Sequence, residues 1–235
     1  MANGILLYKG PSQIDKECIV VIATQNSNNH KTGPMTQTWI MRADIPPHQA
    51  IKQKKDFSIC GSCPHRLHGS CYVTTFRAPL AVWNAWKRGA YPSGSSYLAK
   101  NEIRLGSYGD PAAVPVGVWE DVLSKTRLEH TGYTHLWRQA NPELKKYCMA
   151  SCDSIEDKDE ARLAGWRTFR IRTGPDDPLD PDEMVCPASL EAGKKTTCQR
   201  CGLCYGAGGD KNIAIIVHGT QAKINKFKEV QCSPF

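Results

Sequence analysis

The sequence predicts an α/β protein with a mainly parallel sheet, open or closed into a partial (β/α) barrel, and with Cys-rich loops. Two observations predict this fold. From residue 79 onward, short β-branched segments alternate with helix-like segments of roughly ten residues, which is typical of parallel sheets. The 235-residue chain also holds 11 cysteines, several of them only two residues apart, in segments rich in glycine or proline.

Two paired strands are expected in the N-terminal part. Residues 19–24 (IVVIAT) form a short β-branched run that ends in a polar residue, which is typical of a buried strand. Residues 38–42 (TWIMR) are expected to pair with it. The connection between the two segments contains Gly33 and Pro34, which favour a turn.

The alternation after residue 79 predicts the rest of the sheet. Pro79 suits the first position of a helix, Trp83 and Trp86 follow it, and Gly89 is a suitable end. Ligands bind at the carboxyl ends of the strands in such folds, so strand exits are the places to search for a site. Further strands are expected at residues 102–105, 133–137, 148–152, 168–172 and 213–218, and helices at 115–123, from 142 onward and at 155–165.

Length and composition predict one domain over residues 1–235. It comprises N-terminal strands and a loop in 1–56, a cysteine-bearing βα core in 57–218 and a C-terminal tail in 219–235. No segment has the roughly 18 uninterrupted apolar residues of a membrane span, and the N-terminus lacks a basic leader, which favours a cytoplasmic protein without membrane contact. The formal charge of +7 permits nucleic-acid binding without establishing it.

The cysteines are best explained by metal binding. In a reducing compartment, thiols stay free unless a metal or catalysis uses them. Cysteines two residues apart cannot easily form a disulfide with each other, but they can bind the same ion or cluster. The chain also lacks a Walker-type phosphate loop, a nucleophile elbow and an H-E-x-x-H motif, so none of those enzyme classes is indicated.

The strongest motif is C-x2-C-x2-C, formed by Cys198, Cys201 and Cys204 and preceded by Cys186 next to Pro187. Three thiolates with this spacing can each bind a different iron of one [4Fe–4S] cluster, as in bacterial ferredoxin loops, and Cys186 is the natural fourth ligand. Zinc, which binds four thiolates in a tetrahedron, is the alternative. Zinc sites usually pair two C-x2-C units, so a third cysteine two residues further on favours the iron–sulfur cluster.

A second constellation contains Cys60, Cys63, Cys71, His65 and His68 within twelve residues. A zinc ion bound by the three cysteines and one of the histidines fits this segment, and so does an iron–sulfur cluster bound by the three cysteines alone. In the second case, one iron stays open to a substrate or cofactor. The two constellations can also share one site across the fold.

A few residues outside these segments are candidates for a pocket. Asp153 follows the strand expected at 148–152, and an acidic residue at a strand exit can bind polar ligands. His135 and His218 lie in or at the ends of expected strands, where a structural histidine is the more common finding. Cys148 and Cys152 are expected in the core, because free cysteine is among the most buried residue types.

A three-cysteine loop, then a helix, then a strand that runs into residues 106–111 (GSYGDP) resembles the radical S-adenosylmethionine superfamily. The resemblance covers residues 57–218 and implies a partial (β/α) barrel, with an open cluster on Cys60, Cys63 and Cys71. It also implies that the turn with Gly109 and Asp110 lies near the methionyl part of S-adenosylmethionine. The Cys186, Cys198, Cys201 and Cys204 set would hold an auxiliary cluster.

Two features differ from that superfamily. The cysteine spacing is C-x2-C-x7-C instead of C-x3-C-x2-C, and Asp110 stands where glutamate is usual. The chain, including its closing C-x2-C-x2-C, also resembles uncharacterised phage-encoded proteins, which would place it in the cytoplasm of a host cell.

Three functions follow as hypotheses. The first is a redox or radical-type enzyme with a small-molecule substrate or redox partner at the carboxyl ends of the strands. The second is a zinc-stabilised nucleic-acid-binding module, and the third is a cluster that only stabilises the fold. In all three, the seven cysteines named above are the candidate metal ligands; the candidate cofactor-binding residues are Gly106, Gly109, Asp110 and Asp153.

Overall fold

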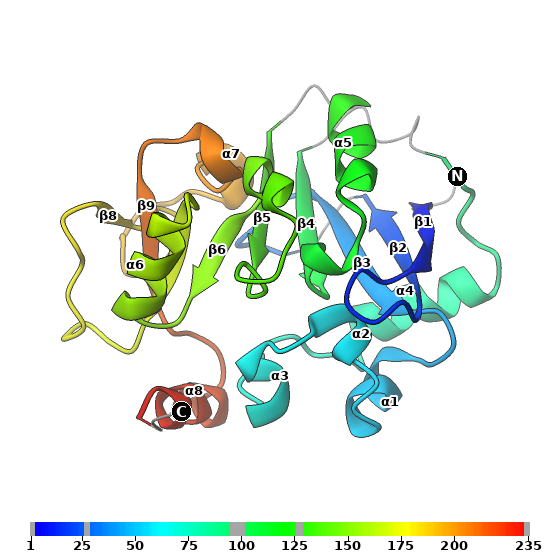
Figure 1. Cartoon of the computed structure of the whole chain (residues 1–235), viewed down its shortest axis with the longest axis horizontal. Coiled ribbons are helices and arrows are strands. Elements are labelled where there is room, and N and C mark those ends of the chain that lie inside the picture. Colours follow the sequence, from blue (N-terminus) through cyan, green and yellow to red (C-terminus); the bar gives the residue numbers. More distant parts are fainter. Residues whose placement is uncertain (1–2, 26–28, 95–101, 126–128, 233–235) are drawn as a thin grey trace.

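Figure 1 shows the computed structural model of the chain, which describes residues 3–25, 29–94, 102–125 and 129–232. The fold is α/β, as expected, and is built on a nine-stranded sheet with the strand order β1-β2-β3-β4-β5-β6-β7-β9-β8. The pairs β1–β2 and β2–β3 are antiparallel, and every later pair in this order is parallel. The strands are β1 (Gly4–Pro11), β2 (Cys18–Thr24), β3 (Thr36–Arg42), β4 (Ile103–Tyr108), β5 (His130–Thr134), β6 (Met149–Cys152), β7 (Thr168–Arg172), β8 (Glu183–Val185) and β9 (Asn212–Ile216).

The parallel strands follow one another in the sheet almost in the order in which they occur in the chain. Each connection between neighbouring parallel strands therefore has to run from the carboxyl end of one strand back to the amino end of the next. As a result, the carboxyl ends of β3, β4, β5, β6 and β7 lie side by side. The sheet is open, with β1 and β8 as its two edges.

The helices cover the sheet and both of its ends. α4 packs against β3, and α6 packs against β6 and β7. The short helices α2 and α3 and the C-terminal helix α8 lie at the end where the parallel strands terminate, whereas α7 lies at the opposite end (Figure 1). The helices are α1 (Pro47–Lys52), α2 (Phe57–Cys60), α3 (Pro64–His68), α4 (Ala78–Lys87), α5 (Val116–Lys125), α6 (Ile155–Leu163), α7 (Cys198–Cys201) and α8 (Gln221–Cys232), with 3₁₀ turns η1 (Pro111–Ala113), η2 (Pro142–Lys146) and η3 (Gly206–Gly208).

The main core lies around β2, whose residues from Ile19 to Ala23 are fully buried. A strand covered on both faces reads as a continuous apolar run, which explains the sequence IVVIA. On α5, the fully buried Trp119 donates its indole N–H to the carbonyl of Pro111 at 3.0 Å. None of the helices in the described ranges has both the length and the apolar character needed to cross a bilayer.

Most of the expected elements are confirmed, among them β2, β3, β7, β9, α4 and α6. The position expected for the strand at 133–137 was wrong, because β5 ends at Thr134 and leaves His135 beyond its carboxyl end. The Thr134 hydroxyl accepts a hydrogen bond from the N–H of Leu136 at 3.0 Å, and such a local bond turns the chain out of the sheet. Within residues 219–235, the structure adds α8, which the sequence analysis did not include.

A buried ion pair fixes the edge strand β8. Arg170 of β7 is 1% exposed, and its guanidinium donates to both carboxylate oxygens of Glu183 in β8, at 2.8 and 2.7 Å. It also donates to Asp177 at 2.8 Å and to the carbonyl of Pro178 at 2.7 Å. Because β8 has only three residues, these bonds hold it in place, and with it Cys186, which follows β8 directly.

Replacing Arg170 with methionine is expected to lower the free energy of unfolding by about 3–5 kcal/mol, because the buried carboxylate of Glu183 loses its partner. Arg162→Met is the matched control: Arg162 is 48% exposed in its pair with Asp182, and a loss below about 1 kcal/mol is expected. Urea unfolding followed by circular dichroism measures both variants. Equal losses in the two would contradict a special role for the buried pair.

Candidate functional site

A cavity of about 970 Å³ lies along one face of the sheet, over β3, β4, β5, β7 and β9. Residues two apart in one strand line it, such as Thr131 with Tyr133 in β5 and Phe169 with Ile171 in β7. This alternation is what one face of a sheet presents. The cavity reaches both ends of the sheet, because residues of α7 and of the segment around α2 and α3 also line it.

All seven cysteines that the sequence analysis named as metal ligands line this cavity. The other described cysteines do not: Cys18 is exposed, and Cys148 and Cys152 are buried in the core, as expected. None of the ten cysteines whose side chains the structure describes forms a disulfide. The seven form two sets, the loop set Cys60, Cys63 and Cys71 and the C-terminal set Cys186, Cys198, Cys201 and Cys204.

Main-chain hydrogen bonds attach the C-terminal set to the sheet. The N–H of Cys186 donates to the carbonyl of Ala214 in β9 at 2.8 Å. The carbonyl of Cys204 accepts from the N–H of Gly132 in β5 at 3.1 Å. Gly132 itself has no room for a side chain, because a Cβ atom there would lie 2.6 Å from the sulfur of Cys148. The C-terminal set is therefore fixed at two separate strands.

The four sulfurs of the C-terminal set act on one another electrostatically. Burial raises the pKa of the Cys204 thiol to about 12, a hydrogen bond with Tyr133 lowers it in part, and the other three thiols raise it further. Burial likewise raises the pKa of Cys198, and the positive charges of Arg104 and Lys31 oppose that shift. The four thiols thus lie near one another and next to two cations.

The sulfurs are nevertheless farther apart than the ligands of a single ion. Within the described ranges, one group of His, Cys, Asp and Glu residues has its ligand atoms within 4.8 Å of one another, and that group contains no cysteine. Neither cysteine set is therefore compact enough to surround one ion as it stands.

The loop set lies around α2 and α3, beside the carboxyl ends of the strands. The N–H groups of His65 and Arg66 are hydrogen-bonded to the Cys63 sulfur, and that of Val73 to the Cys71 sulfur. Burial raises the pKa of Cys63 to about 11 in spite of these bonds. Amide donors aimed at sulfur favour a thiolate bound to metal.

The last residues of β4 and the tight turn that follows join the loop set to the sheet. Gly106 and Gly109 have φ angles of +69° and +78°, which favour glycine, and a Cβ atom on Gly109 would lie 2.7 Å from Ile40. The N–H of Asp110 donates to the carbonyl of Ile59 in α2 at 2.6 Å. The expected cofactor-binding residues of this turn therefore line the cavity next to the loop set.

The buried carboxylate of Asp110 is fully engaged by its neighbours. One oxygen accepts from the N–H of Ala112 at 2.9 Å and from the Thr134 hydroxyl at 2.7 Å, and the other accepts from the N–H of His135 at 2.8 Å. Burial raises the pKa of Asp110, and the bonds from Thr134 and Ala112 oppose that shift. In this arrangement Asp110 positions His135 at the exit of β5.

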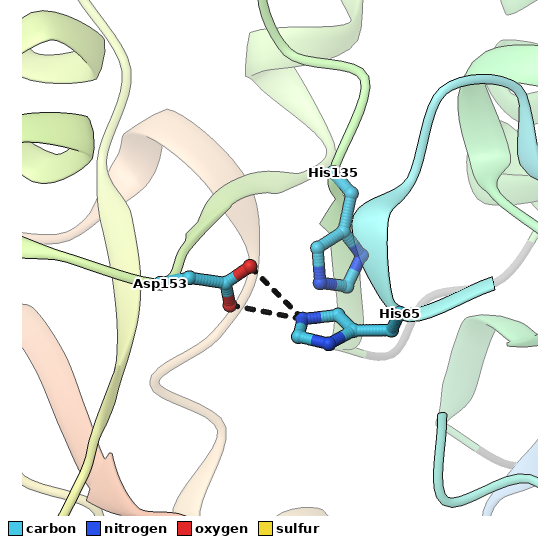
Figure 2. A group of neighbouring side chains, drawn as sticks. All are labelled: His65, His135 and Asp153. Atoms are coloured by element: carbon cyan, nitrogen blue, oxygen red, sulfur yellow. Dashed lines mark hydrogen bonds and ion pairs between the residues drawn. The ribbon is translucent and has the colours of Figure 1, made fainter. Parts of the chain in front are cut away.

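Figure 2 shows a group that the sequence analysis did not assemble, His65, His135 and Asp153. His65 Nε2 lies 3.0 Å from Asp153 Oδ1 and 2.9 Å from Oδ2. Burial alone would raise the pKa of Asp153, but the hydrogen bond from His65 and the charges of His65 and His135 bring it below its usual value. The carboxylate is therefore held in its anionic form.

The environment of the cysteines differs from the expectation in two respects. His65 is directed to Asp153 and His68 is exposed, so neither histidine is gathered with the loop set into a Cys3His arrangement. Secondly, the sequence did not predict that Lys31 and Arg104 lie next to the C-terminal set. No local motif marks these two cations, because only the folded sheet brings them to the cysteines.

Comparisons of the chain with family models, with curated proteins and with solved structures find no match. The site is therefore interpreted from its own residues. The resemblance of residues 57–218 to radical S-adenosylmethionine enzymes stays a prediction.

Asp110→Asn is expected to lower the free energy of unfolding by about 1–3 kcal/mol, because an amide NH2 group would face donors that the carboxylate now accepts from. Asp121→Asn on α5 is the control, since its contact with Lys125 is exposed and is worth about 0.5 kcal/mol or less. Urea denaturation of the two variants measures the difference. If Asp110→Asn unfolds like the control, the carboxylate does not hold the exit of β5.

Proposed function

We propose that the chain is an iron–sulfur protein, with one [4Fe–4S] cluster on the C-terminal set and a second on the loop set, both facing a shared substrate cavity. One observation carries this proposal. The seven cysteines with metal-ligand spacing are the seven that line the cavity, whereas Cys18, Cys148 and Cys152 lie elsewhere. If all the cysteines served only in packing, those with metal-ligand spacing would not be expected to line the cavity while the others lie outside it.

The separation of the sulfurs supports iron–sulfur clusters over single zinc ions. Four thiolates bound to one zinc ion at about 2.3 Å lie about 3.8 Å apart. In a cubane, each thiolate binds a different iron, so the sulfurs are held farther apart. Among the described residues, no three sulfurs of either set lie within 4.8 Å of one another, so the sets are wider than a zinc site.

The surroundings of the C-terminal set fit an anionic cluster. Lys31 and Arg104 are close enough to lower the pKa of Cys198. The N–H of Ala188 is hydrogen-bonded to the sulfur of Cys186, and Tyr133 is hydrogen-bonded to that of Cys204. Positive charge and donors directed at sulfur both stabilise a cluster that carries net negative charge.

The loop set supports the more specific part of the proposal, a radical S-adenosylmethionine-like enzyme on a partial (β/α) barrel. Three cysteines without a fourth would leave one iron of a cubane open to the cavity. When bound, such a cluster supplies one-electron chemistry at an open coordination position. Gly106 and Gly109 line the cavity beside the loop set. Because they have no side chains, a cofactor can approach their main chain closely.

The cavity favours a small organic substrate that carries an anionic group. Its volume of about 970 Å³ is within the range of small-molecule sites. Phe169 and Ile215 supply an apolar wall, and Arg104 and Lys31 supply positive charge. A substrate held there lies between the two cysteine sets.

Protein purified without oxygen is expected to be brown, to absorb broadly near ~400 nm and to contain about eight irons and eight sulfides per chain. Cys204→Ser is expected to lose about four of these irons, because one ligand of the C-terminal cluster is removed. Cys18→Ser is the control and should retain all of them, since Cys18 lies outside the cavity. A colourless protein with stoichiometric zinc would contradict the proposal and support the zinc-stabilised module.

Adding S-adenosylmethionine to the reduced protein is expected to change the electron paramagnetic resonance spectrum of the loop cluster, because the ligand would bind the open iron. Cys71→Ser should abolish this response and leave the signal of the C-terminal cluster in place. A spectrum that does not respond in the native chain would refute the radical-type enzyme while leaving the iron–sulfur assignment intact.

A further inference from the structure

A site of a different chemical kind lies beside the loop set. It consists of imidazole and carboxylate groups only, from His65, His135 and Asp153 (Figure 2). Their ligand atoms lie within 4.8 Å of one another, and no other group of three or more potential ligands in the described ranges meets that limit. The close approach of these three side chains has to be explained.

The fold brings the three side chains together from separate elements. His65 belongs to α3, His135 follows β5, and Asp153 follows β6. The main chain of His135 is fixed by its bond to Asp110, and the N–H of Asp153 donates to the carboxylate of Asp157 at 3.2 Å. Two of the groups thus sit on rigid strand ends, which is where a binding site can be held accurately.

The distances match those between ligands of one ion. Two ligands with metal bonds of about 2.0–2.1 Å lie about 2.8–3.4 Å apart at octahedral to tetrahedral angles. His65 Nε2 and the Asp153 carboxylate are separated by 2.9–3.0 Å. An ion can therefore enter with small movements of these two side chains.

His65 also has a hydroxyl partner of the kind that orients metal ligands. Its Nε2 faces Asp153, and its other ring nitrogen, Nδ1, lies 2.7 Å from Ser70 Oγ. Such a partner fixes the ring orientation of a ligand histidine. His135 Nε2, which faces the other two side chains in Figure 2, lies 3.1 Å from Ser151 Oγ, a contact that an ion would replace. His65 is further held by Phe227 of α8, whose ring stacks on it at 5.4 Å between centroids.

We propose that His65, His135 and Asp153 bind one divalent first-row transition-metal ion, with its remaining coordination positions open to the cavity that both histidines line. Two imidazoles and one carboxylate are ligands of Zn²⁺ and Fe²⁺, whereas Mg²⁺ and Ca²⁺ prefer oxygen ligands alone. The ion would act as a Lewis acid on a substrate oxygen in the cavity. This site goes beyond the clusters and does not depend on them, because no cysteine contributes to it.

Zinc uptake by the chain purified without oxygen tests this proposal. The metal already bound to the protein is counted first, and the protein is then dialysed against Zn²⁺. One further equivalent is expected to bind. Asp153→Asn and His135→Gln should each weaken the binding of that equivalent by more than about 100-fold, and Ser70→Ala by about 10–100-fold through the orientation of His65.

His218→Gln is the matched control, because His218 lines the same cavity outside the group and should bind zinc as the native chain does. Circular dichroism establishes that the variants are folded, and Ser70→Ala, the mildest change, keeps the test valid if another variant misfolds. Failure of the native chain to bind a further equivalent would overturn the proposal and show that Ser70, His65 and Asp153 form only a hydrogen-bonded chain. Unchanged uptake by Asp153→Asn, His135→Gln and Ser70→Ala would also overturn it. Iron content, measured on the same samples, reports separately on the clusters.

Discussion

The order of the parallel strands is the constraint on which two of the proposed sites depend, the loop set and the group of His65, His135 and Asp153. Because β4, β5 and β6 are neighbours in the sheet, their exits place Asp110, His135 and Asp153 side by side. The segment after β3 then crosses these exits and is attached to them by the bond between Asp110 and Ile59. That one segment carries both the loop set and His65, so thiol and imidazole ligands meet at the same end of the cavity.

The proposed metal binding has a cost at the buried thiols of the cavity, and the surroundings of each set reduce that cost. Burial raises the pKa of Cys60, Cys63, Cys71, Cys198 and Cys204, so the empty fold favours neutral thiols. Binding a metal requires thiolates and therefore releases protons, and the bond energy has to exceed that requirement. Lys31 and Arg104 reduce the cost at the C-terminal set, and amide donors reduce it at the loop set. The polar environment of each set would therefore lower the cost of forming the proposed clusters.

Features that depend on local sequence patterns were predicted correctly, whereas contacts between distant segments were not. The β-branched runs of β2 and β9 and the cysteine spacings are local, and they predicted the strands and the two cysteine sets. The end of β5 was misplaced because apolar residues continue to Trp137, while the hydroxyl of Thr134 ends the strand. His65 and Asp153 are 88 residues apart, so no spacing rule can pair them. Their pairing follows only from the strand order.

Anomalous diffraction at the iron absorption edge, from crystals grown without oxygen, is the most direct measurement of the central claim. Two compact groups of iron are expected at opposite ends of the cavity, one among the sulfurs of the C-terminal set and one among those of the loop set. Zinc in place of iron, or disulfides between the cavity cysteines, would contradict it.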